Sequence, residues 1–186
     1  MKILITYIIY FGIIAINLIM TFFNKKNKFI ITLSLIGILI LMAGNNYNAD
    51  YYNYMNFYYS DLSYGNFELG FIILVKIFRL LNINYETFLF FIFSICLCIN
   101  VLIIKKFKTN IHCVLFLYIL IQLPADTVQY RNYIASTFLL LSLYCNYNEN
   151  KIGTLISILV SLSFHRTFII YLPILFINEK YIKFLI

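Results

Sequence analysis

The chain has 186 residues, of which 63% are hydrophobic and only 11% charged, with a formal net charge of +7. Soluble domains carry charge on about a quarter of their residues, so this composition excludes an ordinary soluble domain and predicts an all-α bundle of membrane helices. The positive charges fall between apolar segments and form no basic face, which argues against a nucleic-acid partner. The cysteines lie in apolar stretches without metal-ligand spacing, so we expect neither disulfides nor a metal site.

Eight apolar segments are candidate membrane helices. They cover residues 3–23, 29–43, 71–83, 87–104, 111–125, 133–145, 152–164 and 167–177. The first is longer than a signal-peptide core and no small-residue cleavage pattern follows it, so we interpret it as a retained span. A span needs about 20 apolar residues, which leaves room for about seven. We expect one transmembrane domain over residues 1–186, as the N-terminal part of a longer architecture.

Lysines cluster between these segments, and the positive-inside rule assigns the clusters to the cytoplasm. The clusters are Lys25, Lys26 and Lys28, then Lys105, Lys106 and Lys108, then Lys151, and finally Lys180 and Lys183. The first two lysine clusters lie on the same side of the membrane only if one of the apolar segments between them does not cross it. Segment 71–83 is the candidate, because Lys76, Arg79 and Asn82 recur every three residues as a polar stripe. We expect it to be an outer interfacial or re-entrant amphipathic helix.

This topology puts the N-terminus outside and sorts most other charged side chains to the outer face. Those at or near that face are Asp50, Asp61, Glu68, Arg79, Asp126, Arg131, His165 and Arg166. The positive-inside rule, applied to the lysines alone, therefore predicts that the candidate reactive groups lie on the outer side of the membrane.

The outer loop, residues 44–69, is rich in tyrosine and asparagine. Tyrosine rings stack on sugars and asparagine binds hydroxyls, which suits carbohydrate, but the same tyrosines are typical of an interfacial aromatic belt. Asp50 and Glu68 lie near the two ends of the loop, close to the membrane surface. Either carboxylate could deprotonate a hydroxyl nucleophile. The alternative is that each is an exposed acidic side chain of the loop without a catalytic role.

Residues 123–131 combine a helix break with a helix start. Asp126 is expected to cap the next helix, with Gln129 completing a capping box. Arg131 then lies in the early turns of that helix, where a guanidinium beside unpaired backbone N–H groups suits a phosphate. The alternatives are that Arg131 snorkels to lipid headgroups or pairs with Asp126.

His165 and Arg166 separate two short apolar segments, where Gly, Asn or Pro would be the usual turn residues. This favours His165 as a proton acceptor or hydrogen-bond donor, although an interfacial histidine and a snorkelling arginine would also fit. The other histidine, His112, is expected to be interfacial only.

Four short segments resemble the EpsG family of exopolysaccharide-synthesis membrane proteins, which is grouped with Wzy-type polysaccharide polymerases. They are Asp50-Tyr51 with Tyr54, Glu68-Leu69-Gly70-Phe71, Arg131-Asn132-Tyr133-Ile134-Ala135 and Phe164-His165-Arg166-Thr167. Their order, spacing and position relative to the apolar segments carry the resemblance, over about residues 44–173.

The resemblance implies polymerisation of undecaprenyl-diphosphate-linked oligosaccharide units at the outer face of a bacterial cytoplasmic membrane, where the multi-pass chain would reside. Asp50, Glu68 and His165 would be catalytic, and Arg131, Arg166, Tyr51 and Tyr54 would bind substrate. The expected partners are the lipid-linked oligosaccharide, membrane lipids and other polysaccharide synthesis or export proteins. No cofactor is expected, and no Gly-rich phosphate loop occurs.

Three alternatives remain open at this stage. One is another lipid-carrier-dependent membrane glycosyltransferase, which would use the same residues. A second is a transport component, although transport calls for polar groups near mid-membrane, where Asn17 and Asn100 are the main examples. A third is a non-catalytic member of an export system.

Overall fold

The computed structural model describes residues 2–23, 26–46, 48, 50–60, 67–107 and 109–176. Every regular element in these ranges is a helix, which confirms the all-α prediction. The elements are α1 (Lys2–Phe22), α2 (Lys28–Ala43), α3 (Tyr51–Tyr59), α4 (Leu69–Leu80), α5 (Tyr85–Lys106), α6 (Ile111–Leu117), the π-helix η2 (Tyr118–Gln122), α7 (Leu123–Asp126), α8 (Tyr130–Tyr147), α9 (Lys151–Phe164) and the 3-10 helix η3 (Arg166–Phe176). Asp61, Lys25, Lys108, Lys180 and Lys183 lie outside the described residues.

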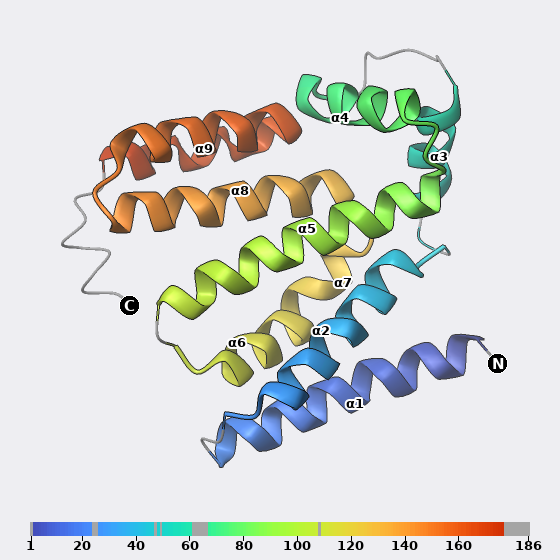
Figure 1. The fold of residues 1–186 in the computed structure, drawn as a ribbon, viewed down its shortest axis with the longest axis vertical. Coiled ribbons are helices and arrows are strands. Elements are labelled where there is room, and N and C mark those ends of the chain that lie inside the picture. The colour runs from blue at the N-terminus through green and yellow to red at the C-terminus, as the bar shows by residue number, and fades with distance from the viewer. Residues whose placement is uncertain are drawn as a thin grey trace.

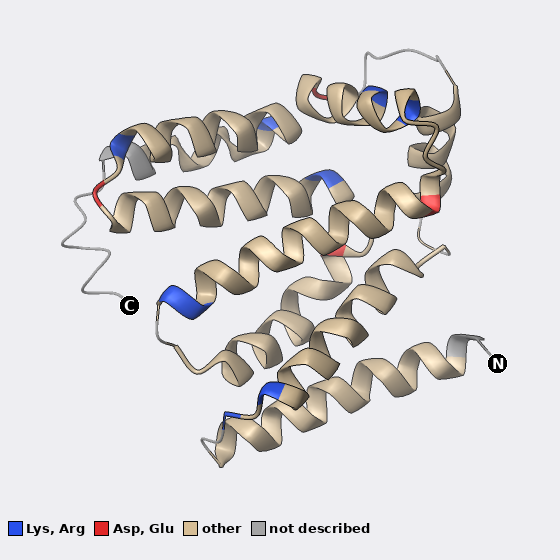
Figure 2. Ribbon diagram, viewed as in Figure 1, with Lys and Arg blue, Asp and Glu red and all other residues tan. Residues whose placement is uncertain are grey.

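The long helices run back and forth between two ends of the bundle (Figure 1). At the lysine end, marked by Lys26, Lys105 and Lys151, α1 leads to α2, α5 to α6 and α8 to α9. At the opposite end, which we call the site end, α2 leads to α3, α7 to α8 and α9 to η3. Figure 2 shows the charged residues gathered at the two ends, with long uncharged stretches of helix between them.

Asparagines begin several of these helices. The side chains of Asn27, Asn84, Asn110 and Asn150 each accept a hydrogen bond from a backbone N–H in the first turn of α2, α5, α6 and α9, respectively. Such caps satisfy N–H groups that have no partner within the helix. The asparagine-rich connections therefore determine where the apolar segments become helical.

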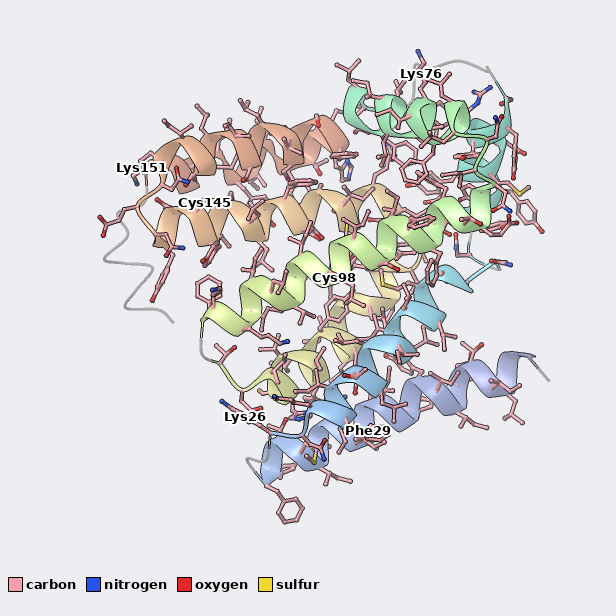
Figure 3. All side chains as sticks on the ribbon, viewed as in Figure 1. Lys26, Phe29, Lys76, Cys98, Cys145 and Lys151 are labelled. Carbon is pink, nitrogen blue, oxygen red and sulfur yellow. The ribbon has the colours of Figure 1, made fainter. Side chains whose placement is uncertain are left out.

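Within the described ranges, two helices are long and apolar enough to cross a membrane, namely Leu4–Phe22 and Tyr85–Lys106. Shorter apolar helices cover Lys28–Ala43, Ile111–Asp126 and Lys151–Phe164. The helix α4 has 12 residues, which at 1.5 Å per residue gives about 18 Å, less than the roughly 30 Å hydrocarbon core. Its Lys76 points away from the bundle (Figure 3), so the polar side of α4 faces outward.

The expected outer loop contains a helix that the sequence analysis missed. In α3 the side chains of Tyr51, Tyr54, Phe57 and Tyr58 are buried, and they follow one another at helical spacing on one face. The Tyr58 hydroxyl donates to the carbonyl of Ile83, 2.6 Å away. Four of the loop aromatics thus form core, which corrects the expectation of a surface belt or a sugar-stacking surface for these residues.

His112, which we expected to be interfacial only, is fully buried between α1, α2 and α6 at the lysine end. Its Nδ1 lies 2.9 Å from Oδ1 of Asn17, whose amide donates to Oγ of Ser34 at 2.7 Å. Its Nε2 accepts the backbone N–H of Asn27 at 3.4 Å. The buried polar groups are thereby paired with one another, as the low-dielectric interior requires.

Candidate functional site

Glu68 lies at the site end, just before α4, and its carboxylate contacts groups from two other elements. One oxygen, Oε2, forms an ion pair with Nη1 of Arg131 in the first turn of α8. The other, Oε1, lies 3.4 Å from Nδ1 of His165 and accepts the backbone N–H of Arg166, also at 3.4 Å. Residues almost a hundred positions apart in sequence therefore meet at one carboxylate.

The close approach of α4 to α9 depends on Gly70. A Cβ atom at this position would lie 2.4 Å from the Ser163 hydroxyl oxygen and 2.7 Å from the Ser163 carbonyl oxygen. Contacts this short with backbone cannot be relieved by rotating a side chain. Glycine at position 70 thus lets the start of α4 pack on the last turn of α9, which puts Glu68 beside His165.

Arg131 is held by aromatic rings as well as by Glu68. The centre of its guanidinium group lies 4.8 Å from the Phe67 ring centroid and 5.8 Å from that of Tyr54. Its Nε–H points to the Tyr54 hydroxyl, 3.4 Å away, and the Tyr54 ring packs against Tyr130 with centroids 4.9 Å apart. These contacts restrict the side chain and orient its charge.

The surroundings keep Glu68 ionised. Burial by itself would raise the pKa of the Glu68 carboxyl, but hydrogen bonds from its own backbone and the nearby Arg131, His165 and Arg166 hold that pKa below its ordinary value. The pKa of the Tyr54 phenol is raised, mainly by burial, even though Arg131 acts in the opposite direction. At neutral pH the site therefore contains a carboxylate and a neutral phenol around Arg131.

His165 ends α9 in an extended conformation, which turns its ring toward Glu68. A carboxylate only accepts hydrogen bonds, so the contact with Glu68 assigns the proton of a neutral imidazole to Nδ1. The other ring nitrogen, Nε2, then carries a lone pair and can take a proton. The pairing of an imidazole with an orienting carboxylate is the arrangement that general bases require.

The cluster is partly accessible to solvent and has an excess of positive charge. The side chains of Arg131, His165 and Glu68 are 21%, 24% and 15% exposed, and Arg166 is exposed. With His165 neutral, the cluster and its neighbour Arg166 contain two guanidinium groups and one carboxylate, although Arg166 contacts Glu68 through its backbone. An anion could therefore bind here while displacing little of the existing structure.

The structure brings together Glu68, Arg131, His165 and Tyr54 of the expected site residues, with Arg166 joined through its backbone. Asp50 is the N-cap residue of α3 and its side chain makes no capping hydrogen bond; its charge contributes to the raised pKa of Tyr54. Tyr51 is buried, with its hydroxyl 3.5 Å from Glu86. The buried rings of Tyr51 and Tyr54 support the site from behind, which differs from the exposed sugar-binding rings that we expected.

The capping box proposed for Asp126 is wrong. Asp126 ends α7, and its carboxylate accepts hydrogen bonds from the Tyr118 hydroxyl at 3.1 Å and the Gln122 amide at 3.0 Å. Gln129 is the N-cap residue of α8 without a side-chain capping bond. The charged partner of Arg131 is Glu68, not Asp126, because α4 returns to the start of α8.

Sequence reasoning did not assign roles to Gly70, Phe67 or Ser163. A glycine inside an apolar helical segment is the one signal that pointed to a close approach. In the described part of the chain, no group of three or more His, Cys, Asp or Glu side chains could hold a metal ion.

Comparison with known proteins gives one match. The EpsG family matches residues 29–186, which include every segment of the site. No curated protein and no solved structure matches the chain. Three of the segments that carry the resemblance supply Glu68, Arg131 and His165, and these residues meet in the structure. The chain therefore belongs to the EpsG family, whose members are membrane proteins of exopolysaccharide synthesis.

Proposed function

We propose that this protein polymerises polyprenyl-diphosphate-linked oligosaccharide units into a surface polysaccharide at the outer face of the cytoplasmic membrane. The observation that carries the proposal is the convergence of Glu68, Arg131 and His165, from three separate segments, within a member of the EpsG family. The site end is the outer face in this proposal, because the lysine end would be cytoplasmic.

Arg131 and Arg166 bind the diphosphate of the donor lipid. A guanidinium presents a fork of N–H donors that fits phosphate oxygens and stays charged at every relevant pH. Arg131 keeps its orientation through Phe67 and Tyr54 when the anion takes over part of its pairing from Glu68. The diphosphate is the leaving group, so the arginines also stabilise the charge that develops on it in the transition state.

His165 acts as the general base and Glu68 as its positioning residue. Nε2 of His165 takes the proton from a sugar hydroxyl of the acceptor unit, and the hydroxyl oxygen forms a bond to the anomeric carbon of the donor. The bond between that carbon and the diphosphate oxygen breaks, and its electron pair leaves with the diphosphate. The low pKa of Glu68 makes it a poor base but a suitable partner for the imidazolium that forms.

The test is polymer formation by variants of the protein expressed in a strain that lacks its own polymerase. His165→Ala and Arg131→Ala should abolish polymer while the proteins remain in the membrane, and Arg131→Lys should retain a small part of the activity. Lys76→Ala is the matched control, because this cation is exposed and points away from the bundle.

Normal polymer from well-expressed His165→Ala and Arg131→Ala proteins would refute the polymerase assignment. If the strain made polymer only when a second, active polymerase was supplied together with this protein, the protein would instead have a non-catalytic role in the export system. Lipid-linked units that accumulate in the His165→Ala strain would place the defect at polymerisation and not at transport.

A further inference from the structure

A cavity of about 610 Å³ opens between α5, α8, η3 and the continuous helix formed by α6, η2 and α7. This volume is in the range of small-molecule sites and far larger than a single water requires. Most of its wall is apolar, including Leu97, Val101, Leu139, Leu140 and Ile170.

The cavity changes in character along its length. Its residues nearest the lysine end are Ile104 and Val114, which are apolar. Toward the site end the wall includes Asp126, Gln122 and Tyr133. An occupant that matches this lining is an amphiphile with its chain toward the lysine end and its polar head toward the site end.

Two polar side chains of the wall, Asn100 on α5 and Tyr133 on α8, lie next to each other. The side-chain oxygen of Asn100 and the hydroxyl of Tyr133 are buried and make no hydrogen bond of good geometry with a described residue. These side chains make one part of the wall polar, and most of the remaining lining is apolar.

The polar end of the cavity adjoins the proposed diphosphate site. Asn132 and Thr167 line the cavity, and they directly follow Arg131 and Arg166 in the sequence. Since consecutive Cα atoms are about 3.8 Å apart, the backbone of each arginine lies next to a residue that lines the cavity.

The walls of the cavity also depart from regular α-helix. One wall includes the π-helix η2, and another is η3, which has 11 residues of 3-10 helix. Runs of 3-10 helix beyond 3–4 residues are uncommon, and π-turns occur frequently at functional sites. Both irregular segments contribute side chains to the wall of the cavity.

We propose that this cavity holds the isoprene units nearest the diphosphate in a lipid-linked sugar whose diphosphate binds at Arg131 and Arg166. The inference rests on the proposed function for the choice of lipid, but the location of the chain is a separate claim. With the chain in the cavity and the diphosphate at the two arginines, the anomeric carbon of the donor lies between the cavity and His165.

Binding of two diphosphates to the purified full chain in phosphatidylglycerol nanodiscs tests the location. Undecaprenyl diphosphate should bind at least about tenfold more tightly than geranyl diphosphate, because only its long chain fills the cavity. Leu140→Trp should remove this chain-length preference and leave geranyl diphosphate binding unchanged. Leu159→Trp is the control, since Leu159 lies on α9 and is 54% exposed.

A diazirine amino acid placed at position 139 identifies the occupant directly. Mass spectrometry should find isoprenoid adducts at position 139 and far fewer at position 159. Equal adducts at both positions, phospholipid adducts alone, or a chain-length preference that survives Leu140→Trp would overturn the inference. The proposed function fails separately, if Arg131→Ala binds both diphosphates as tightly as the unmodified protein does.

Discussion

The two histidines of this chain are placed in opposite ways. His112 is fully buried and its partners, Asn17 and the backbone of Asn27, are neutral. His165 is 24% exposed and lies beside an ionised carboxylate, Glu68, that also pairs with Arg131. Both imidazoles have oriented rings, but only His165 has access to a ligand.

The difference separates a polar group that stabilises the fold from one that is suited to chemistry. Both nitrogens of His112 are used in hydrogen bonds that join α1, α2 and α6, so any proton transfer there would break the packing. The ring of His165 has one nitrogen held by Glu68 and the other able to react. Partial exposure and a charged neighbour, and not residue type alone, therefore make His165 the candidate for chemistry.

Among the variants that test this comparison, the largest effect is expected from Gly70→Ala, which tests whether the arrangement around His165 depends on the approach of α4 to α9. The new Cβ would meet the Ser163 carbonyl at 2.7 Å, so the start of α4 must move and take Glu68 away from His165. Polymer formation should fall by at least about a hundredfold, which is about 2.8 kcal/mol in the activation barrier.

Gly12→Ala is the matched control, because nothing lies within 4 Å of a Cβ at that position. Its polymer yield and membrane abundance should equal those of the unmodified protein. Activity in Gly70→Ala close to that of Gly12→Ala would show that the site does not need this contact.

The second prediction concerns the buried histidine. His112→Leu leaves Oδ1 of Asn17 and the N–H of Asn27 without their partner, and should lower the free energy of unfolding by about 2–3 kcal/mol. Thermal unfolding in detergent measures this loss, while the polymer yield per folded molecule should stay the same.

A triple variant sharpens the interpretation. Combining His112→Leu with Asn17→Leu and Ser34→Ala removes most of the network at once, so fewer polar atoms remain unpaired. It should be more stable than His112→Leu alone. If His112→Leu instead lost polymer formation without any loss of unfolding free energy, His112 would not be a purely structural residue, and the difference drawn between the two histidines would be wrong.

The sequence was sufficient to predict the helical class, the break before α8, and the positions of Arg131 and His165 near helix ends. These follow from local signals, namely apolar length, charge placement and turn residues. The pairing of Arg131 with Glu68 could not be read from the sequence, because it depends on the folding that returns the start of α4 to the start of α8. The capping role expected for Asp126, and its alternative pairing with Arg131, were wrong for the same reason. Both favoured a residue that is near in the sequence, whereas folding brings Glu68 to Arg131.

The helix α3 could have been predicted, since its buried aromatics recur at helical spacing. It was missed because tyrosine and asparagine are typical of membrane-surface loops. The partners of Asn17 and His112 had no such signal. A polar residue within an apolar helix predicts a buried partner but does not identify the helix that supplies it.

The third prediction is a loss of about tenfold in polymer formation for Glu68→Gln. The amide keeps the size of the side chain but loses the charge that orients His165 and pairs with Arg131. Hydrogen bonds to charged groups contribute about 1.5–3 kcal/mol, and the amide retains part of this. Polymer length and yield measure the loss, and a normal yield would remove Glu68 from the mechanism.

The pH dependence of stability provides a control for this variant. The pKa of Glu68 is lower in the folded protein than its ordinary value of 4.5, so its contribution to stability is present above that pH and is lost as the pH falls through the lower, folded pKa. The unfolding temperature should therefore fall less steeply on the acid side in Glu68→Gln than in the unmodified protein. Identical acid-side slopes would mean that the carboxylate is not stabilised by its neighbours.

The smallest effect is expected from Asp50→Asn. The side chain of Asp50 makes no capping bond at α3, and its charge reaches the site through Tyr54, whose pKa it helps to raise. Removing that charge leaves Arg131 in place between Phe67 and Tyr54, so polymer formation should change by less than about threefold, or about 0.7 kcal/mol. Assays of Asp50→Asn and Glu68→Gln at equal membrane abundance give the comparison. A loss for Asp50→Asn as large as that for Glu68→Gln would make Asp50 the general base, and it would leave His165 to bind the diphosphate together with Arg131.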